Sequence, residues 1–280
     1  MSKKEPKNIN IDIQTVEGFG DEWSRFNQKD LSDSARMYED YFKVFPWERL
    51  DQKSIGADVG CGSGRWAVVV APKIGHLHLI DASNQALEVA KENLKSNTNC
   101  SFHNCSLDAM PIPDGSLDFA YSLGVLHHIP DTQEGIRSIA EKLKTGGIFL
   151  AYIYYRFDNR PLWFKLIWKL SDFVRRCICR LPYSIRYFLS QIIAISIYWP
   201  LSRSALFLEK VYKPLNNFPL FWYRNKSFYS LRTDALDRFG TKLERRYTKP
   251  EITSMLKSAG FRNIVFSEEA PFWCVSAVKK

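Results

Sequence analysis

Between Ile55 and Tyr155, short apolar runs rich in β-forming residues alternate with stretches of helical periodicity, and this alternation constrains the fold most strongly. It is typical of parallel βαβ units joined by right-handed crossovers. Apolar residues fall on one helical face over 86–94 and 132–143, which predicts a helix in each range. Five strands are predicted here, at 55–59, 77–80, 100–103, 117–121 and 148–153.

The C-terminal residues predict the rest of the sheet. The stretch 251–258 follows Pro250 and predicts a helix that ends near Gly260. Two closing strands are predicted at 263–266 and 272–278. The expected fold class is therefore α/β: a Rossmann-like, seven-stranded, mostly parallel sheet with helices on both faces, plus a helical insert or lid.

The chain divides into four parts by pattern and composition. An N-terminal tail and helical lead-in is expected over 1–50, the core over 51–155, a mainly helical insert over 156–246, and the closing helix and strands over 247–280. The polar stretch 1–7 fits a frayed tail and not a signal peptide, so the cytoplasm is the expected location. The six cysteines have no paired metal-ligand spacing, so reduced thiols and no metal are expected.

The insert holds the whole basic excess of the chain. The formal net charge is +9, and residues 156–246 have 18 Lys/Arg against 6 Asp/Glu. A local positive field of this kind suits an anionic substrate, a phospholipid surface or nucleic acid. Ninety residues without secondary structure are uncommon in a compact protein, so the insert should contain helices and act in substrate recognition.

Two apolar stretches lie in the insert. From Trp163 to Cys177, apolar residues fall on one helical face and Lys165, Lys169 and Arg176 largely on the other. The stretch 187–199 is apolar nearly all round, is shorter than the ~20 residues that cross a bilayer, and is expected to end at Pro200. Peripheral membrane contact through 161–200, at the inner membrane surface, is one interpretation. The other is that the apolar face packs on the core while the arginines are solvated.

The run Asp58-Val59-Gly60-Cys61-Gly62-Ser63-Gly64 ends the first predicted strand just before a helix. Such glycines permit a tight turn and close approach of a cofactor to the backbone, and the helix start offers free N–H groups. The strict alternation differs from the G-x-G-x-x-G spacing of dinucleotide-binding turns. A purely structural turn is the alternative.

The sequence resembles the class I methyltransferase family over residues 51–155. The resemblance rests on this turn, on Asp81 after the second strand, and on the segments 110–118 and 126–131. The resemblance implies S-adenosylmethionine as cofactor and S-adenosylhomocysteine as product, with Asp81 on the ribose hydroxyls. Asp81 could instead cap a helix. Ser106 stands where the family often has an acidic residue for adenine, with Leu107 next to it and Asp108 as a substitute. The implied cofactor-binding residues are Asp58, Gly60, Cys61, Gly62, Gly64, Asp81, Ala82, Ser106, Leu107, Asp108, Ser122 and Leu123.

His127 and His128 are the candidates for a general base, because imidazole titrates near neutral pH and their loop borders the sulfonium in the family. One ring could instead only pack or cap the following helix. The candidate substrate residues come from the lead-in and the insert: Trp23, Tyr155, Arg156, Arg160, Tyr229 and Arg232. Three segments, 21–26, 160–164 and 232–240, resemble an uncharacterised bacterial subgroup, and the resemblance suggests cell-surface glycan-linked or lipid-linked chemistry.

The expected reaction is methyl transfer to an O or N atom of a small acceptor, which is anionic, amphiphilic, or linked to a lipid or glycan. No Asn-Pro-Pro-Tyr-like or Pro-Cys motif is present, which disfavours nucleobase methylation. Three rivals stay open: an RNA methyltransferase using the basic insert, a non-catalytic S-adenosylmethionine-binding or membrane-associated protein, and a nicotinamide oxidoreductase. Nucleic acid is not favoured as a partner, and the sequence indicates no oligomeric state.

Overall fold

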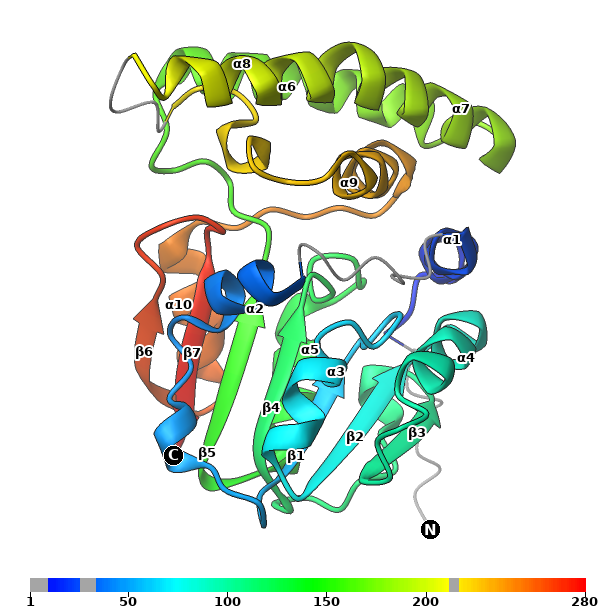
Figure 1. The fold of residues 1–280 in the computed structure, drawn as a ribbon. Helices are drawn as coiled ribbons and strands as arrows, with labels where there is room; N and C mark the ends of the chain where they lie inside the picture. The colour runs from blue at the N-terminus through cyan, green and yellow to red at the C-terminus, as the bar shows by residue number, and fades with distance from the viewer. Residues whose placement is uncertain (1–9, 26–33, 212–216) are drawn as a thin grey trace, which may run out of the picture.

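A seven-stranded sheet with the order β3-β2-β1-β4-β5-β7-β6 forms the centre of the protein (Figure 1). The computed structural model describes residues 10–25, 34–211 and 217–280. Strands β1 to β5 are parallel, and β7 runs antiparallel to both of its neighbours. The predicted α/β fold is thus confirmed. The strands are β1 (Ile55–Val59), β2 (His76–Asp81), β3 (Cys100–Asn104), β4 (Leu117–Leu123), β5 (Leu143–Tyr152), β6 (Phe261–Phe266) and β7 (Cys274–Lys279).

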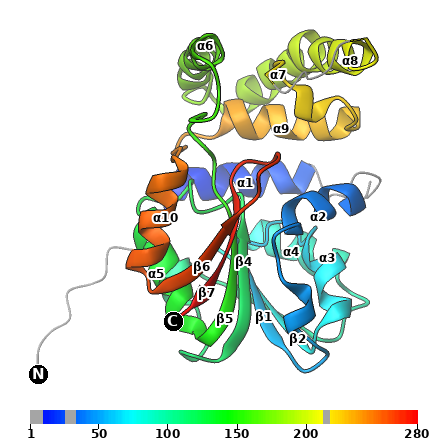
Figure 2. The same ribbon diagram turned by 90° about the vertical axis from the view of Figure 1, so that its left-hand side faces the viewer.

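Helices cover both faces of this sheet (Figure 2). One face carries α2 (Ser34–Phe42), α3 (Ala67–Val70) and α4 (Asn84–Asn93), and the other carries α5 (Thr132–Lys142) and α10 (Lys249–Ser258). Side chains alternate between the faces along each strand, so each face has its own apolar core. Short turns η1 (Trp47–Arg49), η2 (Ala71–Lys73) and η3 (Leu107–Ala109) connect these elements.

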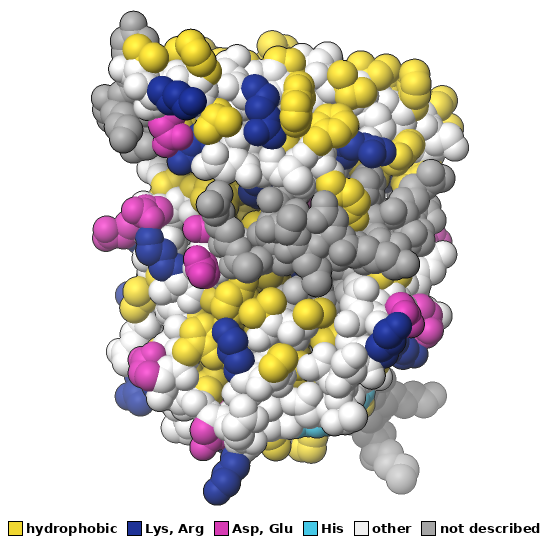
Figure 3. Space-filling view, viewed as in Figure 1, with side chains coloured by type: hydrophobic (Ala, Val, Ile, Leu, Met, Phe, Trp, Pro, Cys, Tyr) yellow, Lys and Arg dark blue, Asp and Glu magenta, His cyan; other side chains and the backbone are white. Residues whose placement is uncertain are grey.

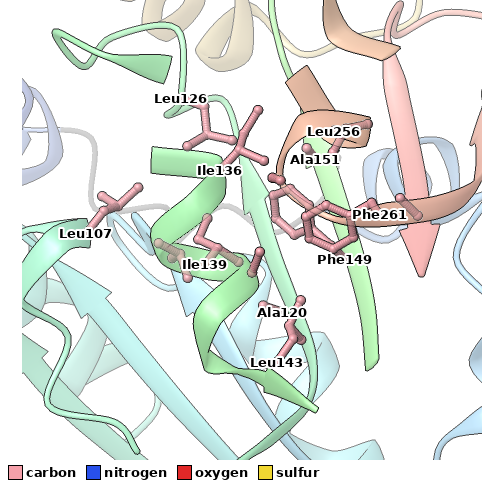
Figure 4. Packing of buried hydrophobic residues seen from close by; sticks show 14 of the residues in the cluster. Leu107, Ala120, Leu126, Ile136, Ile139, Leu143, Phe149, Ala151, Leu256 and Phe261 are labelled. Carbon is pink, nitrogen blue, oxygen red and sulfur yellow. The ribbon is translucent and has the colours of Figure 1, made fainter. Parts of the chain in front are cut away.

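The core under α5 and α10 shows how tightly the closing strands are joined to the rest of the sheet (Figure 4). Phe149 of β5 stacks on Phe261 of β6 with ring centroids 5.4 Å apart. Helix α10 begins with a capping box, in which Thr248 and Glu251 satisfy each other's backbone N–H groups. The two closing strands predicted from the sequence are therefore part of this core.

The insert forms a separate helical layer above the carboxyl ends of the parallel strands (Figures 1 and 2). It consists of α6 (Leu162–Ile178), α7 (Tyr183–Ile193), the π-helical segment η4 (Ala194–Tyr198), α8 (Trp199–Leu208), η5 (Phe221–Tyr223) and α9 (Phe228–Gly240). The lead-in helix α1 (Ile13–Arg25) lies between this layer and the sheet (Figure 2). The predicted helical insert and helical lead-in are both present.

The segments α7, η4 and α8 form one continuous helix, Tyr183–Leu208, of 26 residues, which we call the long helix. The prediction that a short helix ends at Pro200 was wrong. The π-helical segment ends at Tyr198, two residues before Pro200, and such a wider turn accommodates a residue that lacks an N–H group. By length and composition alone, the long helix is the one described helix that could cross a membrane.

Helix α6 presents its apolar face to the outside. The expectation that this face packs on the core while the arginines are solvated was wrong, because Asp172, Arg175 and Ile178 are the buried residues of this helix. The side chains that the helix exposes are large and apolar: Leu162, Trp163, Leu166, Ile167, Leu170, Phe173 and Val174.

Buried ion pairs, not solvated arginines, occupy the inner side of α6. Arg175 Nε donates to Asp172 Oδ1 at 2.8 Å. Arg238 and Arg246 both donate to Glu244 Oε1, at 2.6 and 2.8 Å. Burial alone would raise the pKa of Glu244, but the charges of Arg246, Arg238 and Arg175 hold it at about 2. Arg175, Arg238 and Arg246 are thus paired with buried carboxylates inside the insert.

The variant Glu244→Gln is expected to lower the free energy of unfolding by about 3–5 kcal/mol, because it leaves buried arginines without a charge partner. In the wild type, the stabilisation exists above the ordinary glutamate pKa of 4.5 and is lost as the pH falls through about 2. Thermal unfolding followed by circular dichroism from pH 7 to pH 2 measures both effects. Glu134→Gln, in a partly exposed pair with Arg137, is the control and should cost about 1 kcal/mol at most. Equal costs for the two variants would contradict the role of the network.

Candidate functional site

The turn after β1 can be built only with glycine at several positions. Gly60, Gly62 and Gly64 have φ angles of 77°, 54° and 74°, a region that other residues rarely adopt. A Cβ atom at position 60 would also lie 2.4 Å from Cγ2 of Val125. The alternating glycines of the sequence therefore have a direct conformational reason.

Asp81, at the end of β2, ties this turn to the start of α4. The N–H of Gly62 donates to Asp81 Oδ2 at 2.8 Å, and the N–H of Ser83 donates to Oδ1 at 2.8 Å. Burial raises the pKa of Asp81, although both backbone hydrogen bonds oppose this. Each carboxylate oxygen keeps a second lone pair, so Asp81 can accept further hydrogen bonds from a bound hydroxyl group.

A cavity of about 1400 Å³ begins at the glycine turn and continues between the sheet and the insert. Its wall includes most of the residues that the sequence singled out, from both the core and the insert. These are Gly60, Cys61, Gly62, Asp81, Ala82, Ser106, Leu107, Leu123, His128, Tyr155 and Arg160.

Four of the expected cofactor residues lie behind this wall. The hydroxyl of Ser122 donates to the carbonyl oxygen of Val59 at 2.9 Å. Asp58 is 1 % exposed, and burial raises its pKa to about 8. A Cβ atom at Gly64 would lie 3.0 Å from Leu94 Cδ1, so this glycine permits close packing against α4. Asp108 is the fourth; it is half-buried in η3 and does not line the cavity.

The two histidines have different surroundings. His127 is fully buried, stacks on Tyr154 with ring centroids 3.7 Å apart, and has its pKa held well below the ordinary value by burial. It is not part of the cavity wall. His128 is part of the wall, and its Nδ1 lies 2.7 Å from the carbonyl oxygen of Leu243, which fixes that nitrogen as the donor. Its Nε2 has no hydrogen-bond partner among the described residues.

Asp237 of α9 faces His128 across the cavity, and the sequence analysis missed it. Its Oδ1 lies 3.9 Å from His128 Nε2, and its Oδ2 accepts a hydrogen bond from the Tyr154 hydroxyl at 2.6 Å. Burial raises the pKa of Asp237. No local pattern marks this residue, because its role depends on how the insert folds back over the core.

Helix α1 covers the cavity from the N-terminal side. Phe19 contacts His128 edge to face, with ring centroids 5.1 Å apart. A Cβ atom at Gly20 would lie 2.8 Å from the Ser83 hydroxyl and 2.4 Å from Gln85 Oε1, so α1 passes close to the start of α4. Trp23, an expected substrate residue, belongs to α1, but its side chain lies outside the described residues.

The expected substrate residues are only partly confirmed as residues of the wall. Tyr155 and Arg160 line the cavity, and Arg160 Nε donates to the Tyr155 hydroxyl at 3.2 Å. The other three expected residues do not line the cavity. Arg156 pairs with Glu251 at the surface, Arg232 hydrogen-bonds Gln191 and Tyr187 of α7, and Tyr229 lies in the first turn of α9 away from the wall.

Residues 57–147 match the family model described as a methyltransferase domain. Residues 57–147 therefore form a methyltransferase domain of the class I S-adenosylmethionine-dependent type. The chain is 30% identical over 145 residues to the uncharacterised methyltransferase YcgJ of Bacillus subtilis, a match that covers 46% of this chain and 55% of YcgJ. It is 34% identical over 114 residues to the demethylmenaquinone methyltransferase of Listeria welshimeri, which covers 38% and 47% of the two chains. The chain thus spans about half the length of these relatives.

A solved structure shows the same fold beyond the matched domain. The S-adenosylmethionine-dependent methyltransferase of Aquifex aeolicus superposes with a TM-score of 0.50 at 14% identity, covering 91% of this chain and 96% of that chain. At this identity, the similarity concerns the fold alone.

The residues of the cavity fit the cofactor of this family, S-adenosylmethionine. The glycine turn leaves its backbone free of side chains, and Asp81 retains acceptor capacity beside it. The buried hydroxyl of Ser63 has no hydrogen-bond partner among the described residues, as expected for a polar group at a ligand site.

Proposed function

We propose that this protein transfers a methyl group from S-adenosylmethionine to an oxygen or nitrogen atom of a small amphiphilic acceptor. One observation supports the proposal above all others: a single cavity joins the glycine turn and Asp81 to His128 and Asp237. A methyl donor held by the glycine turn and Asp81 would meet an acceptor held by His128 and Asp237 inside that cavity. The protein mainly has to align the two in a near-attack geometry.

The core supplies the cofactor side of this site. Asp81 would accept hydrogen bonds from the ribose hydroxyls, and Ser106 and Leu107 would border the adenine. The turn 60–64 would lie against the amino-acid part of the cofactor. When bound, S-adenosylmethionine supplies an electrophilic methyl group on a sulfonium.

His128 and Asp237 would act on the acceptor. Because His128 Nδ1 donates to the Leu243 carbonyl, Nε2 has the lone pair and can take the proton that the acceptor O–H or N–H loses. The Asp237 carboxylate, 3.9 Å from Nε2, would then stabilise the positive imidazolium. Tyr154 holds Asp237 in place through its hydroxyl. The assignment of His128 as general base thus gains a positioning residue from the insert.

The far end of the cavity favours an acceptor with an apolar part. Beyond Asp237, the wall contains Phe157, Phe164 and Trp168, together with apolar residues of the long helix. Arg160 lies on the same wall and could pair with an anionic group of the acceptor. A lipid-linked or glycan-linked acceptor at the inner membrane surface fits both properties.

The rival functions have less support. An RNA methyltransferase would need an array of basic residues on an exposed face, but Arg175, Arg238 and Arg246 pair with buried carboxylates and most exposed residues of α6 are apolar. The spacing of the glycines in the turn disfavours a nicotinamide dinucleotide. A protein that binds S-adenosylmethionine without consuming it has the same cofactor site, so it has to be distinguished by experiment.

The test is to incubate the protein with methyl-labelled S-adenosylmethionine and three acceptor pools: membrane lipid extract, water-soluble metabolites and total RNA. We expect label in the organic phase of the lipid extract and release of S-adenosylhomocysteine. Label in RNA would support the rival instead. Binding of S-adenosylhomocysteine without transfer to any pool would indicate a non-catalytic protein.

A further inference from the structure

The insert exposes two stripes of large apolar side chains, one on α6 and one on the long helix, which together we call the outer face. Figure 3 shows apolar side chains exposed over this layer, with basic side chains between them. Leu166, Leu170 and Phe173 of α6 are 65%, 68% and 66% exposed. Soluble monomers rarely expose extended apolar patches, and those that do usually bind something there. The face contains Leu162, Trp163, Leu166, Ile167, Leu170, Phe173 and Val174 of α6, and Ile185, Phe188, Ile192, Ile195, Ile197, Trp199 and Phe207 of the long helix.

In helix α6, the buried and exposed faces are the reverse of those of a typical helix in water. Its buried side includes the ion pair of Asp172 with Arg175, and its exposed side is almost wholly apolar. Burying ions while exposing leucine, isoleucine and phenylalanine is unfavourable in water. An apolar medium against the outer face would remove the free-energy cost of exposing these apolar side chains to water.

The long helix packs along its length against other parts of the insert. Its buried residues recur every three or four positions: Ser190, Ala194, Tyr198, Ser202 and Ala205. The α7 and η4 parts of the helix pack on α9, and the α8 part packs on η5. Arg186 donates to the carbonyl of Gly240, and Arg203 donates to the carbonyls of Arg224 and Lys226. Crossing a bilayer would break these contacts, so the apolar stripe of the helix would lie in the plane of the surface.

The charges around the outer face favour an anionic lipid surface. Lys169 of α6 and Arg180, in the turn after α6, are exposed, and Lys165 of α6 is partly exposed. These three have no ion pair within the described ranges. Trp163 and Trp199 lie in the two stripes, and tryptophan is favoured at the boundary between lipid headgroups and acyl chains. Basic and aromatic residues around an apolar helix face are typical of helices that lie in a membrane interface.

The acceptor cavity reaches this same face. Ile167, Leu170 and Val174 of α6 and Ile197 of the long helix belong both to the outer face and to the cavity wall. We infer that the outer face docks in the plane of an anionic phospholipid membrane, so that the acceptor passes from the bilayer between α6 and the long helix to His128. This inference rests on the proposed function for what occupies the cavity.

Binding to vesicles of phosphatidylglycerol and phosphatidylethanolamine tests the inference by sedimentation. The wild type should bind, and more weakly at high salt or with phosphatidylcholine alone. The double variant Leu166→Glu/Phe173→Glu changes two exposed residues outside the cavity wall. It should bind at least about 100-fold more weakly, because burial of each large apolar side chain changes a partition coefficient by about tenfold or more.

The matched control is Ile13→Glu/Val265→Glu, which introduces the same charges at exposed apolar residues of α1 and β6, and it should bind like the wild type. Cys177, exposed on α6, gives a second readout, since vesicles should slow its reaction with a maleimide. Equal vesicle binding by both double variants, or unchanged labelling of Cys177, would overturn the inference. A third result would also overturn the inference: the protein forms a dimer without lipid, the dimer does not bind vesicles, and only the Leu166→Glu/Phe173→Glu variant dissociates it.

Calorimetry with S-adenosylhomocysteine on the same three proteins keeps this inference separate from the proposed function. Normal binding of the ligand without vesicle binding would reject the docking face and leave the proposed function in place. Vesicle binding without binding of the ligand would reject the proposed function alone.

Discussion

Replacing Gly62 with arginine is expected to abolish the binding of S-adenosylmethionine and S-adenosylhomocysteine in calorimetry. Position 62 has a φ of 54°, which costs a residue with a Cβ atom about 1–2 kcal/mol. The arginine side chain would also fill the space at the start of the cavity, and the altered backbone would move the N–H that donates to Asp81. Both effects act directly on the surface where the cofactor would lie.

Gly115→Arg is the matched control for this variant. Gly115 also has a positive φ, 62°, but it lies in the turn before β4, where a Cβ atom would meet nothing within 4 Å. The control should therefore share the backbone strain and keep full cofactor affinity. Asp81→Ala should weaken binding by about 10–200-fold, the value of one lost hydrogen bond to a charged group. Retained affinity in both Gly62→Arg and Asp81→Ala would remove the cofactor site from this turn.

Replacing His128 with glutamine is expected to lower kcat by about 10²–10⁴-fold while cofactor affinity stays unchanged, because the variant loses the lone pair that would take the acceptor proton. Asp237→Asn should lower kcat less, since Asp237 acts through His128. Acidification should also lower the wild-type kcat as Asp237 is protonated. Because burial raises the pKa of Asp237, this loss should occur at a higher pH than for an ordinary aspartate.

Steady-state kinetics over a range of pH, with calorimetry of S-adenosylhomocysteine, measures these effects. Asp158→Asn is a control with the same chemical change, because Asp158 is exposed and accepts hydrogen bonds from Trp273 and Lys249 outside the cavity wall. It should leave kcat unchanged. If His128→Gln kept full activity, correct alignment of the acceptor would suffice and no general base would be needed.

The parts of the structure that depend on local pattern were predictable from the sequence. Strands, crossover helices and the glycine turn each follow from a short run of residues, and the alternation of strands and helices along the chain predicts a mostly parallel sheet. Which face of α6 is buried could not be predicted, because periodicity identifies an apolar stripe but does not show whether protein or solvent contacts it. The continuous helix through Pro200 was not predicted, because a π-helical segment next to the proline lets the helix continue past a residue without an N–H group.

The candidate site was predictable to the extent that its residues belong to the core. Asp81 and the turn 60–64 come together because neighbouring parallel strands end at the same edge of the sheet. Three residues expected at the substrate site do not line the cavity: Arg156, Tyr229 and Arg232. Their positions depend on the packing of α9 against α7 and on the surface of α10, which the sequence does not show. Asp237 was missed for the same reason, since only the folded insert brings it to His128.

The origin of Asp237 in α9 has a consequence for how the protein is divided into modules. A recombinant fragment limited to the Rossmann-like part would retain the imidazole but lose its anionic neighbour. Transplanting residues 156–246 onto a related scaffold would transfer lipid affinity and a share of the reaction chemistry together. Under the proposed function, the choice of acceptor and the rate of methyl transfer would thus depend on the same contiguous stretch of sequence.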